Sequence, residues 1–497
     1  MTNIGFLPIA PEVILLVGAV LVLMAAVTLD LGKRAWAIIA GASLALSFAA
    51  AWVQWWRIDD VGAQLHYVGE FGRTPMVVMD YFSVFGGGLV VAAGGIALLG
   101  GWRLVDTLDT RGAEYVALVL LAIAGLHIMV ISANLIMMFI GLETASIALY
   151  VVAGFVREEK NSDEAAMKYF LLGSFASALF IYGVALAYAA TGSTSIYGET
   201  GIISYFADRI IIDQGILLVG IALMIVGLGF KVSAAPFHQW APDVYQGAPS
   251  GAVPLMASGV KIAGFAALAR VLTVAFAGNI ADWAQVIGAV AALSVVVGTL
   301  LAIAQSDFKR MLAYSGVAHA GFMMTALVAG QEGIPSLWFY LGTYAFQLIG
   351  TFIIASVISG VTGGTNSLDD YRGLAKRSPV LAGALAILML AMGGIPLTAG
   401  FVGKVGVFAA AIDAGYLWLA IVGLVSAVAG LYFYLRLIVL AYFEDPVPEL
   451  ADEPVVTTRS TRLALSVCVF LTAVFGLIPW PLLNLTAESI PLAGFLP

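Results

Sequence analysis

The sequence consists largely of long apolar segments separated by short polar connections. Hydrophobic residues make up 62 % and charged residues 10 % of the 497 residues, whereas a soluble chain contains about 25 % charged residues. Because a helix needs about 20 apolar residues to span a bilayer, the sequence predicts an all-α polytopic membrane protein with about 14 transmembrane helices. The expected spans lie near residues 10–29, 36–56, 77–101, 113–131, 134–156, 165–190, 214–245, 250–277, 282–304, 309–329, 337–360, 379–412, 417–442 and 462–483.

Basic residues are distributed unevenly between these spans. The loops after odd-numbered spans contain Lys33, Arg34, Arg103, Arg111, Arg157, Lys160, Lys309, Arg310, Arg372, Lys376, Arg377, Arg459 and Arg462. The loops after even-numbered spans contain only Arg57, Arg73 and Arg209. Because cytoplasmic loops carry the excess of lysine and arginine, the odd-numbered loops are predicted to be cytoplasmic and both termini periplasmic.

The segment from Gln214 to Tyr245 is too long for one simple span. It contains Lys231 and, five residues later, Pro236, which cannot donate a backbone hydrogen bond and breaks a helix. A break at membrane depth is tolerated only where it faces protein or water, and an ionisable residue beside it is a candidate functional residue. We therefore expect two half-helices with Lys231 close to the break.

A second long segment, Pro379 to Ile412, is interrupted at Gly393–Pro396 and carries Lys404. The broken spans are the seventh and the twelfth, so a five-helix unit repeated at this offset is inverted in the membrane, as in many transporters. The sequence therefore predicts two inverted five-helix repeats, each containing a broken helix. The expected units are 1–111 (three N-terminal helices), 112–278 (first repeat, helices four to eight), 279–443 (second repeat, helices nine to thirteen) and 444–497 (a loop and the last helix).

Four charged residues are expected deep within spans or beside the helix breaks, where a charge costs at least about 2.5 kcal/mol on insertion scales. Glu143 lies in the middle of the fifth span, and Lys261 lies about ten residues into the eighth. A structural hydrogen bond to a neighbouring helix is the alternative for each, but the cost of burial favours a functional role. Lys231 and Lys404 are favoured further because each lies beside a helix break.

Three other basic residues lie nearer to helix ends. Lys168 is expected in the first turn of the sixth span, where a lysine can extend to the interface, so a functional and a structural role are equally supported. For Arg270 and Arg436, contact with the interface or with lipid headgroups is the favoured interpretation.

The four histidines are scattered along the chain. His319 lies in the middle of the tenth span and is a candidate proton carrier, because the ordinary histidine pKa is about 6.5; a packing role is equally supported. His238 follows Pro236 and could take part in proton entry or exit near the break. His127 is expected to be structural and His66 to lie in a loop.

Several classes of function are excluded by what the sequence lacks. The single Cys468 provides neither a disulfide framework nor a ligand set for an iron–sulfur cluster. No HExxH spacing, Walker loop or GxGxxG motif occurs, so metal and nucleotide sites are not expected. The absence of a basic patch argues against nucleic-acid binding.

Five stretches carry a resemblance to a known family: GFKVSAAPFHQWAPDVYQGAP, VKIAGF, SDFKRMLAYSGVAHAGF, DDYRGLAKRSP and GGIPLTAGFVGKVGVF. Together they resemble the subunit N family of the bacterial proton-pumping NADH:quinone oxidoreductase, respiratory complex I. The motifs are shared with the antiporter-like subunits L and M. Lys404 matches N or L, whereas M would have glutamate there, and the modest length disfavours L.

The resemblance implies fourteen helices and assigns roles to the candidate residues. Glu143 and Lys231 match a pair that changes geometry during turnover, Lys261 a central lysine, and Lys404 the lysine of the distal half-channel. Lys168 matches a lysine of the sixth helix, and His319 matches a polar position of the tenth. A change in the Glu143–Lys231 separation would switch the proton affinity of Lys231, with Lys261, His319 and Lys404 continuing the path.

The resemblance also implies the setting of the chain. The expected location is the bacterial cell inner membrane, with subunit M on one side, subunits A, J and K on the other, and the lateral helix of subunit L alongside. No cofactor is expected in this chain, because the flavin, the iron–sulfur clusters and the main quinone site belong to other subunits. Two alternatives remain open, a subunit of a multisubunit cation/proton antiporter and a membrane spacer without transport.

Overall fold

The structure is a computed structural model that describes residues 6–67, 74–156, 160–208, 214–451, 453 and 455–492. Twelve helices in these ranges are long and apolar enough to cross a membrane. The more polar helix α13 (Phe308–Leu327) and the broken pair α16 (Pro379–Gly393) and α17 (Ala399–Asp413) complete the fourteen predicted crossings. The predicted all-α polytopic fold is confirmed.

The N-terminal part contains three spans and a short hairpin. Its elements are α1 (Ala10–Val27), α2 (Lys33–Val61), β1 (Gln64–Tyr67), β2 (Pro75–Met79), α3 (Tyr81–Gly100) and α4 (Trp102–Thr107). β1 pairs antiparallel with β2, so His66 lies in a strand and not in the predicted loop. Backbone pairing across the hairpin, which a single short polar segment does not reveal, accounts for the difference.

The next stretch corresponds to the predicted first repeat. Its helices are α5 (Gly112–Ile131), α6 (Leu135–Ala153), α7 (Lys160–Thr191), α8 (Ile202–Asp208), α9 (Gln214–Lys231), α10 (Trp240–Gly247) and α11 (Val253–Arg270), which continues as a π-helical turn (Val271–Ala275). The short helix α8 was not predicted. Arg73, Arg157 and Arg209, which entered the prediction of topology, lie outside the described residues.

The remaining helices correspond to the predicted second repeat and the last span. They are α12 (Ile280–Ile303), α13, α14 (Ile334–Ser359), α15 (Leu374–Arg377), α16, α17, α18 (Leu417–Phe443), α19 (Arg459–Leu477) and α20 (Trp480–Glu488). The last span, predicted as one helix, is divided between α19 and α20 because Pro479 follows α19.

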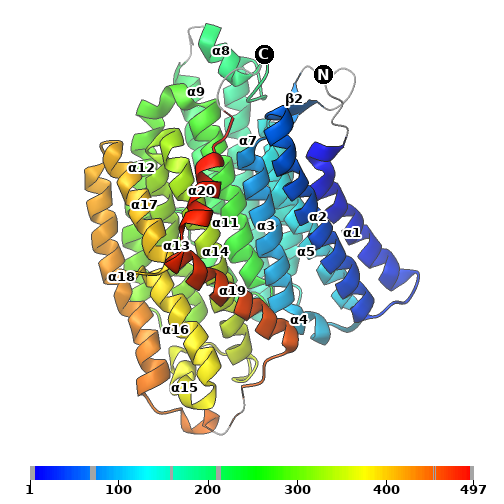
Figure 1. The fold of residues 1–497 in the computed structure, drawn as a ribbon, viewed down its shortest axis with the longest axis vertical. Coiled ribbons are helices and arrows are strands. Elements are labelled where there is room, and N and C mark those ends of the chain that lie inside the picture. The colour runs from blue at the N-terminus through cyan, green and yellow to red at the C-terminus, as the bar shows by residue number, and fades with distance from the viewer. Residues whose placement is uncertain are drawn as a thin grey trace.

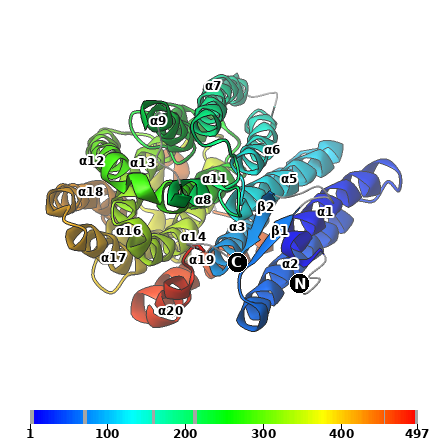
Figure 2. The same cartoon turned by 90° about the horizontal axis from the view of Figure 1, so that it is seen from above.

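The helices lie side by side along the long axis of the molecule (Figure 1). Seen from above, α1 and α2 form one edge, α17 and α18 form the opposite edge, and α11 and α14 lie between them (Figure 2). α11 packs on α14 and α10 packs on α13, so these helices join the two halves. Nearly all residues of α11 and α14 are buried, whereas most residues of α1 and α2 are not.

Several helices start at a polar cap that accepts a backbone hydrogen bond. Asp80 accepts from the Ser83 amide before α3, Asn134 accepts from Ile136 before α6, and Asp307 accepts from Arg310 before α13. Such caps satisfy amides that have no partner within the helix. They fix where α3, α6 and α13 begin.

The first and last described segments lie at the same end of the molecule. Gln54, near the end of α2, donates to the Leu7 carbonyl at 2.7 Å, and the Leu492 amide donates to Asp80 at 3.0 Å. α4 and α15 lie at the opposite end (Figure 1). An even number of crossings follows.

This topology can be tested with tags. We expect tags at Met1 and Pro497 to be labelled only from the periplasm, and a tag in the loop 361–378 only from the cytoplasm, because of the uneven loop charge. Membrane-impermeant labelling of whole cells and inverted vesicles measures both. Termini found on opposite sides would contradict the even number of spans.

Candidate functional site

Four of the predicted site residues are buried within the helix bundle. Lys231 ends α9, Lys261 lies on α11, His319 on α13 and Lys404 on α17. Their exposed fractions are 3 %, 2 %, 1 % and 6 %, respectively. The structure therefore places each of them away from the lipid surface, although they come from segments far apart in the sequence.

The predicted break after Lys231 is confirmed. α9 ends at Lys231 and α10 begins at Trp240, with a cis peptide bond between Ala235 and Pro236. The Trp240 indole donates to the Phe230 carbonyl at 2.9 Å, and the Ala235 amide donates to the Ser294 hydroxyl at 2.8 Å. These bonds satisfy backbone groups that the break removes from the helix, as burial requires.

Lys231 lies in a pocket of hydroxyl and aromatic groups. Its Nζ donates to Ser146 Oγ at 2.7 Å and to the Tyr150 hydroxyl at 3.4 Å. The same Nζ lies 5.5 Å from the Tyr150 ring centroid and 6.0 Å from that of Tyr169. Aromatic faces attract a cation at such distances, so the pocket can hold this lysine in its charged form.

Glu143 lies on α6, three residues before Ser146, and is half-buried. Its Oε1 is buried and has no hydrogen-bond partner among the described residues. The carboxylate is close enough to Lys231 to interact with it electrostatically, but the two residues form no ion pair within the described part of the chain. The hydroxyl of Ser146 occupies the position next to the ammonium instead.

Lys261 connects the two halves of the molecule. Its Nζ donates to the Val232 carbonyl at 2.7 Å and to the Gly316 carbonyl at 3.1 Å. Val232 directly follows the end of α9, where helix carbonyls carry partial negative charge, and Gly316 lies on α13. Lys261 thus lies between the Lys231 break and the helix that carries His319.

His319 is held between hydroxyl groups. Its Nε2 lies 2.9 Å from the Tyr434 hydroxyl and its Nδ1 lies 3.0 Å from the Tyr340 hydroxyl. Tyr434 also bonds to Ser315 at 2.5 Å, and the Tyr344 ring stacks on the imidazole with centroids 4.3 Å apart. Both ring nitrogens therefore have a partner that can either donate or accept a proton.

Lys404 lies beside the second break. Its Nζ donates to the Met392 carbonyl at 3.0 Å and to the Gly393 carbonyl at 2.7 Å, at the end of α16. Gly394 has a φ of +83°, and a Cβ there would lie 2.9 Å from the Lys404 side chain. The break therefore needs glycine both for its left-handed conformation and for the space that the lysine occupies.

These side chains follow one another through the interior, with backbone carbonyls and Phe322 between the titratable groups. Val232 links the Lys231 break to Lys261, and α13 links Lys261, through Gly316, to His319. Phe322, one turn after His319 on α13, lies 5.1 Å from the Lys404 Nζ. The buried row comprises Lys231, Lys261, His319 and Lys404, with Glu143 beside its first member.

Lys168 is not part of the buried row. It forms ion pairs with Glu164 at 2.7 Å and with Asp243 at 2.8 Å, and its side chain is 42 % exposed. Arg310 contacts the other oxygen of Asp243 at 2.6 Å. These groups line a polar cavity of about 320 Å³. The structure thus places Lys168 in a surface ion network at α10.

His238 lies in the break itself and is half-buried. Its ring centroid lies 6.2 Å from that of Tyr314. Tyr314 comes one turn after Arg310 on α13, and Arg310 lines the polar cavity. A role in proton entry is compatible with this position and stays a prediction.

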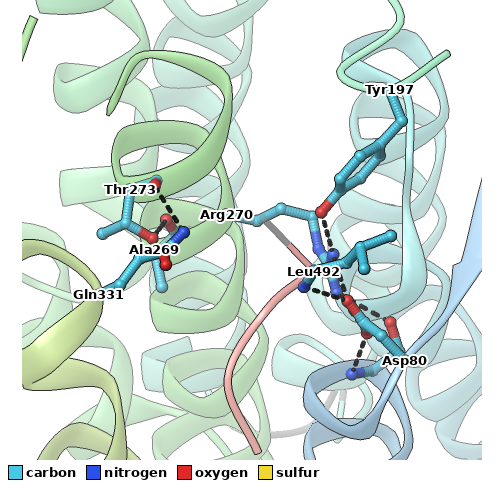
Figure 3. Close-up of polar contacts among 8 residues, drawn as sticks. Asp80, Tyr197, Ala269, Arg270, Thr273, Gln331 and Leu492 are labelled. Carbon is cyan, nitrogen blue, oxygen red and sulfur yellow. Dashed lines mark hydrogen bonds and ion pairs between the residues drawn. The ribbon is translucent and has the colours of Figure 1, made fainter. Parts of the chain in front are cut away.

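The prediction for Arg270 is wrong, because its side chain is completely buried instead of reaching the interface. The guanidinium donates to both Asp80 oxygens at 3.0 and 3.1 Å, to the Tyr197 hydroxyl at 2.7 Å and to Ser83 at 2.8 Å (Figure 3). Asp80 also accepts from Leu492. α11 does not end at the interface, because the π-helical turn continues it and the segments carrying Tyr197 and Leu492 cover it.

Another buried pair lies outside the row. His127 Nδ1 of α5 lies 3.3 Å from Glu12 Oε2 of α1, and both side chains are almost fully buried. Gly87 makes room for the imidazole, since a Cβ there would lie 2.5 Å from His127 Nε2. The pair joins α1 to α5, in line with the structural role expected for His127.

The sequence alone did not single out the hydroxyl groups around the row. Ser146, Tyr150, Tyr340, Tyr344 and Tyr434 lie in apolar spans. One signal was present, since Tyr340 and Tyr344 are four residues apart and therefore share a helix face. A hydroxyl in an apolar span needs a partner, but periodicity does not reveal which one.

Comparisons with known proteins agree with this architecture. The family model described as NADH:quinone oxidoreductase/Mrp antiporter, transmembrane, matches residues 132–430. NADH-quinone oxidoreductase subunit N 1 of Solibacter usitatus is 39 % identical over 432 residues, covering 86 % of this chain and 88 % of that protein.

Two solved structures resemble the fold. A chain of respiratory complex I from Thermus thermophilus with bound aureothin superposes with a TM-score of 0.79 at 32 % identity, covering 95 % of this chain and 98 % of that one. A chain of the Mrp complex from Dietzia sp. superposes with a TM-score of 0.84 at 22 % identity, covering 98 % and 97 %. The second likeness shows the fold alone. From the family match and the identity over most of its length, the chain belongs to the NADH-quinone oxidoreductase subunit N family.

Proposed function

We propose that this chain is a proton-translocating membrane subunit of an NADH:quinone oxidoreductase. The observation that carries the proposal is the buried row from Lys231 to Lys404, which connects two broken helices through the interior. Buried ionisable groups in a membrane protein are costly and typically mark an ion or proton path. The relatives named as subunit N supply the identity of the complex.

The row is suited to proton transfer in steps. Each lysine donates to carbonyl or hydroxyl oxygens at 2.7 to 3.4 Å and is therefore stabilised when charged. His319 has a hydroxyl on either side and can pass a proton between them. A proton leaving Lys261 would reach Lys404 by way of α13, with His319 between the two lysines.

Glu143 acts on the first member of the row. At an effective dielectric constant of 20, a pair of unit charges 4 Å apart interacts by about 4 kcal/mol, and doubling the distance halves this energy. A small movement of α6 against α9 would therefore change how firmly Lys231 holds its proton. Within the described residues Glu143 and Lys231 form no direct bond. In this proposal, that arrangement is the state of the switch in which the two charges are separated.

In our proposal, redox chemistry in partner subunits drives this movement. They hold the flavin, the iron–sulfur clusters and the main quinone site, and this chain adjoins subunit M, subunits A, J and K, and the lateral helix of subunit L. The chain lies in the bacterial inner membrane with both termini periplasmic. A multisubunit cation/proton antiporter has weaker support, because the Mrp likeness at 22 % identity extends only to the fold.

Glu143 provides the test. Glu143→Gln removes the charge and keeps the shape, so proton pumping should fail while the complex still assembles. Glu143→Asp keeps the charge, and an added separation of 1–1.5 Å weakens the pair by less than about 1 kcal/mol. Asp should therefore retain substantial activity. Dye-monitored acidification of inverted membrane vesicles during NADH oxidation measures the difference.

Glu114→Gln is the matched control, because Glu114 is exposed in the first turn of α5. It should pump like the parent. Parent-like pumping by Glu143→Gln would show that Glu143 is structural and that other groups set the proton affinity of Lys231.

A further inference from the structure

An apolar crevice is lined by the N-terminal helices α2 and α3 and by the later helices α14, α19 and α20. Its volume is about 300 Å³. It is lined by Trp52 and Trp55 of α2, Phe346 of α14, Phe475 of α19 and Leu485 of α20, together with residues of α3. No charged residue lines it, so the crevice offers nothing to a polar ligand within its walls.

The position of the crevice determines what can enter it. Four of the five helices that line it, α2, α3, α14 and α19, are long and apolar enough to span a membrane. Phe48 and Trp52, which line it from α2, are 46 % and 50 % exposed. Because the lining is apolar and the crevice lies among membrane-spanning helices, a hydrocarbon chain is the occupant that fits its chemistry.

The end of the crevice near the chain termini is acidic. Trp55 contacts the Tyr81 ring at a centroid distance of 4.7 Å, and the Tyr81 hydroxyl donates to Asp59, one turn beyond Trp55 on α2. Glu488 follows Leu485 on α20 and is close enough to interact with Tyr81 electrostatically. Both carboxylates are exposed.

The other charged residues of α2 near this end also favour an acidic environment there. Asp60 adds a third exposed carboxylate at the end of α2. Arg57 is the basic residue closest to Asp59 in the sequence, and at about 100° per residue it lies about 200° around the helix, on the other face. A cationic group is therefore favoured at this mouth over an anionic one.

We propose that the crevice binds one acyl chain of an amine-bearing phospholipid, phosphatidylethanolamine, whose ammonium group lies at Asp59 and Glu488. The hydrocarbon supplies the affinity, since each buried methylene contributes. The two carboxylates select the headgroup. Phosphatidylglycerol, which has the same hydrocarbon but no amine, should bind less well.

The hydrocarbon site can be tested with a matched pair of substitutions. Ala92 lines the crevice, and Ala429 lies exposed on the surface of α18. Native mass spectrometry of the full chain, purified with phosphatidylethanolamine, should show one retained lipid in the parent and in Ala429→Leu. Ala92→Leu should retain about tenfold less, because the added side chain displaces buried methylenes. Equal retention by the two variants would overturn the proposal.

The selection of the headgroup by the two carboxylates is tested in a second experiment. With equal mole fractions of phosphatidylethanolamine and phosphatidylglycerol, the parent should prefer the amine lipid by about threefold to tenfold, the scale of one or two exposed ion pairs. The double variant Asp59→Asn/Glu488→Gln should lose this preference and keep its total lipid. Asp282→Asn/Glu449→Gln removes two exposed carboxylates elsewhere and should behave like the parent.

Two further outcomes would contradict the proposal. A parent that binds both lipids equally would remove the role of the carboxylates. In the assembled complex, a photo-crosslinker at position 48 should capture lipid, because Phe48 lies at the edge of the crevice. Capture of a polypeptide and no lipid would show that a partner subunit covers this face.

Discussion

Replacing Lys261 by glutamine is expected to stop proton transfer through this chain. Glutamine keeps a donor for the Val232 and Gly316 carbonyls that Lys261 contacts, but it cannot carry a proton between them. Removing a positioned proton carrier slows transfer by on the order of 100-fold or more. Because Lys261 lies between the two broken helices, no other member of the row replaces it.

A second buried lysine, Lys309, provides the control for the Lys261→Gln experiment. Lys309 is 5 % exposed and also donates to backbone carbonyls, those of Gln246 at 3.1 Å and Ala248 at 3.5 Å, but it lies outside the buried row. Vesicle acidification at a matched rate of NADH oxidation should be lost in Lys261→Gln and kept in Lys309→Gln. Normal acidification in Lys261→Gln would rule out the relay.

Replacing Arg270 by methionine is expected to cause the largest loss of stability. The substitution leaves Asp80 charged and buried without its bidentate partner, and breaking a buried ion pair in this way costs about 3–5 kcal/mol. Thermal unfolding of the purified chain, followed by the accessibility of Cys468, which is buried, measures the effect. Arg436→Met, at a half-buried arginine of α18, should cost less than about 1 kcal/mol.

A second substitution separates the unpaired charge from lost packing. Asp80 accepts from the Ser83 amide with one oxygen and from the Leu492 amide with the other. In Arg270→Met/Asp80→Asn the asparagine keeps one oxygen that can accept from one of these amides, and no uncompensated charge remains. Most of the lost stability should return, because the cost lies in the orphaned carboxylate. A double variant as unstable as Arg270→Met would assign the effect to packing around the guanidinium.

The sequence predicted the number of spans, the two breaks and the burial of the central lysines. These properties depend on local causes. Span number follows from the length of apolar segments, and each break follows from a proline or a glycine–proline pair. Burial of Lys231, Lys261 and Lys404 follows from the cost of exposing a charge to hydrocarbon.

The relations between distant residues were not accessible in this way. Arg270 was expected at the interface, and its partner Asp80 lies 190 positions away in the sequence. Lys168 has its ion-pair partner on α10 instead of joining the row. Ser146, rather than Glu143, lies next to Lys231. Helical periodicity shows which face a residue occupies, but not which helix packs against that face.

The sequence by itself thus determined what kind of groups this protein buries and at which helix breaks they lie, because insertion into a membrane acts on each segment separately. Only the tertiary structure decided that Lys261 reaches from the end of α9 to α13 and that hydroxyls flank both nitrogens of His319. Those distances arise when helices from both halves pack together. A few ångströms there decide whether a proton can pass, since the electrostatic energy of a pair varies inversely with its separation.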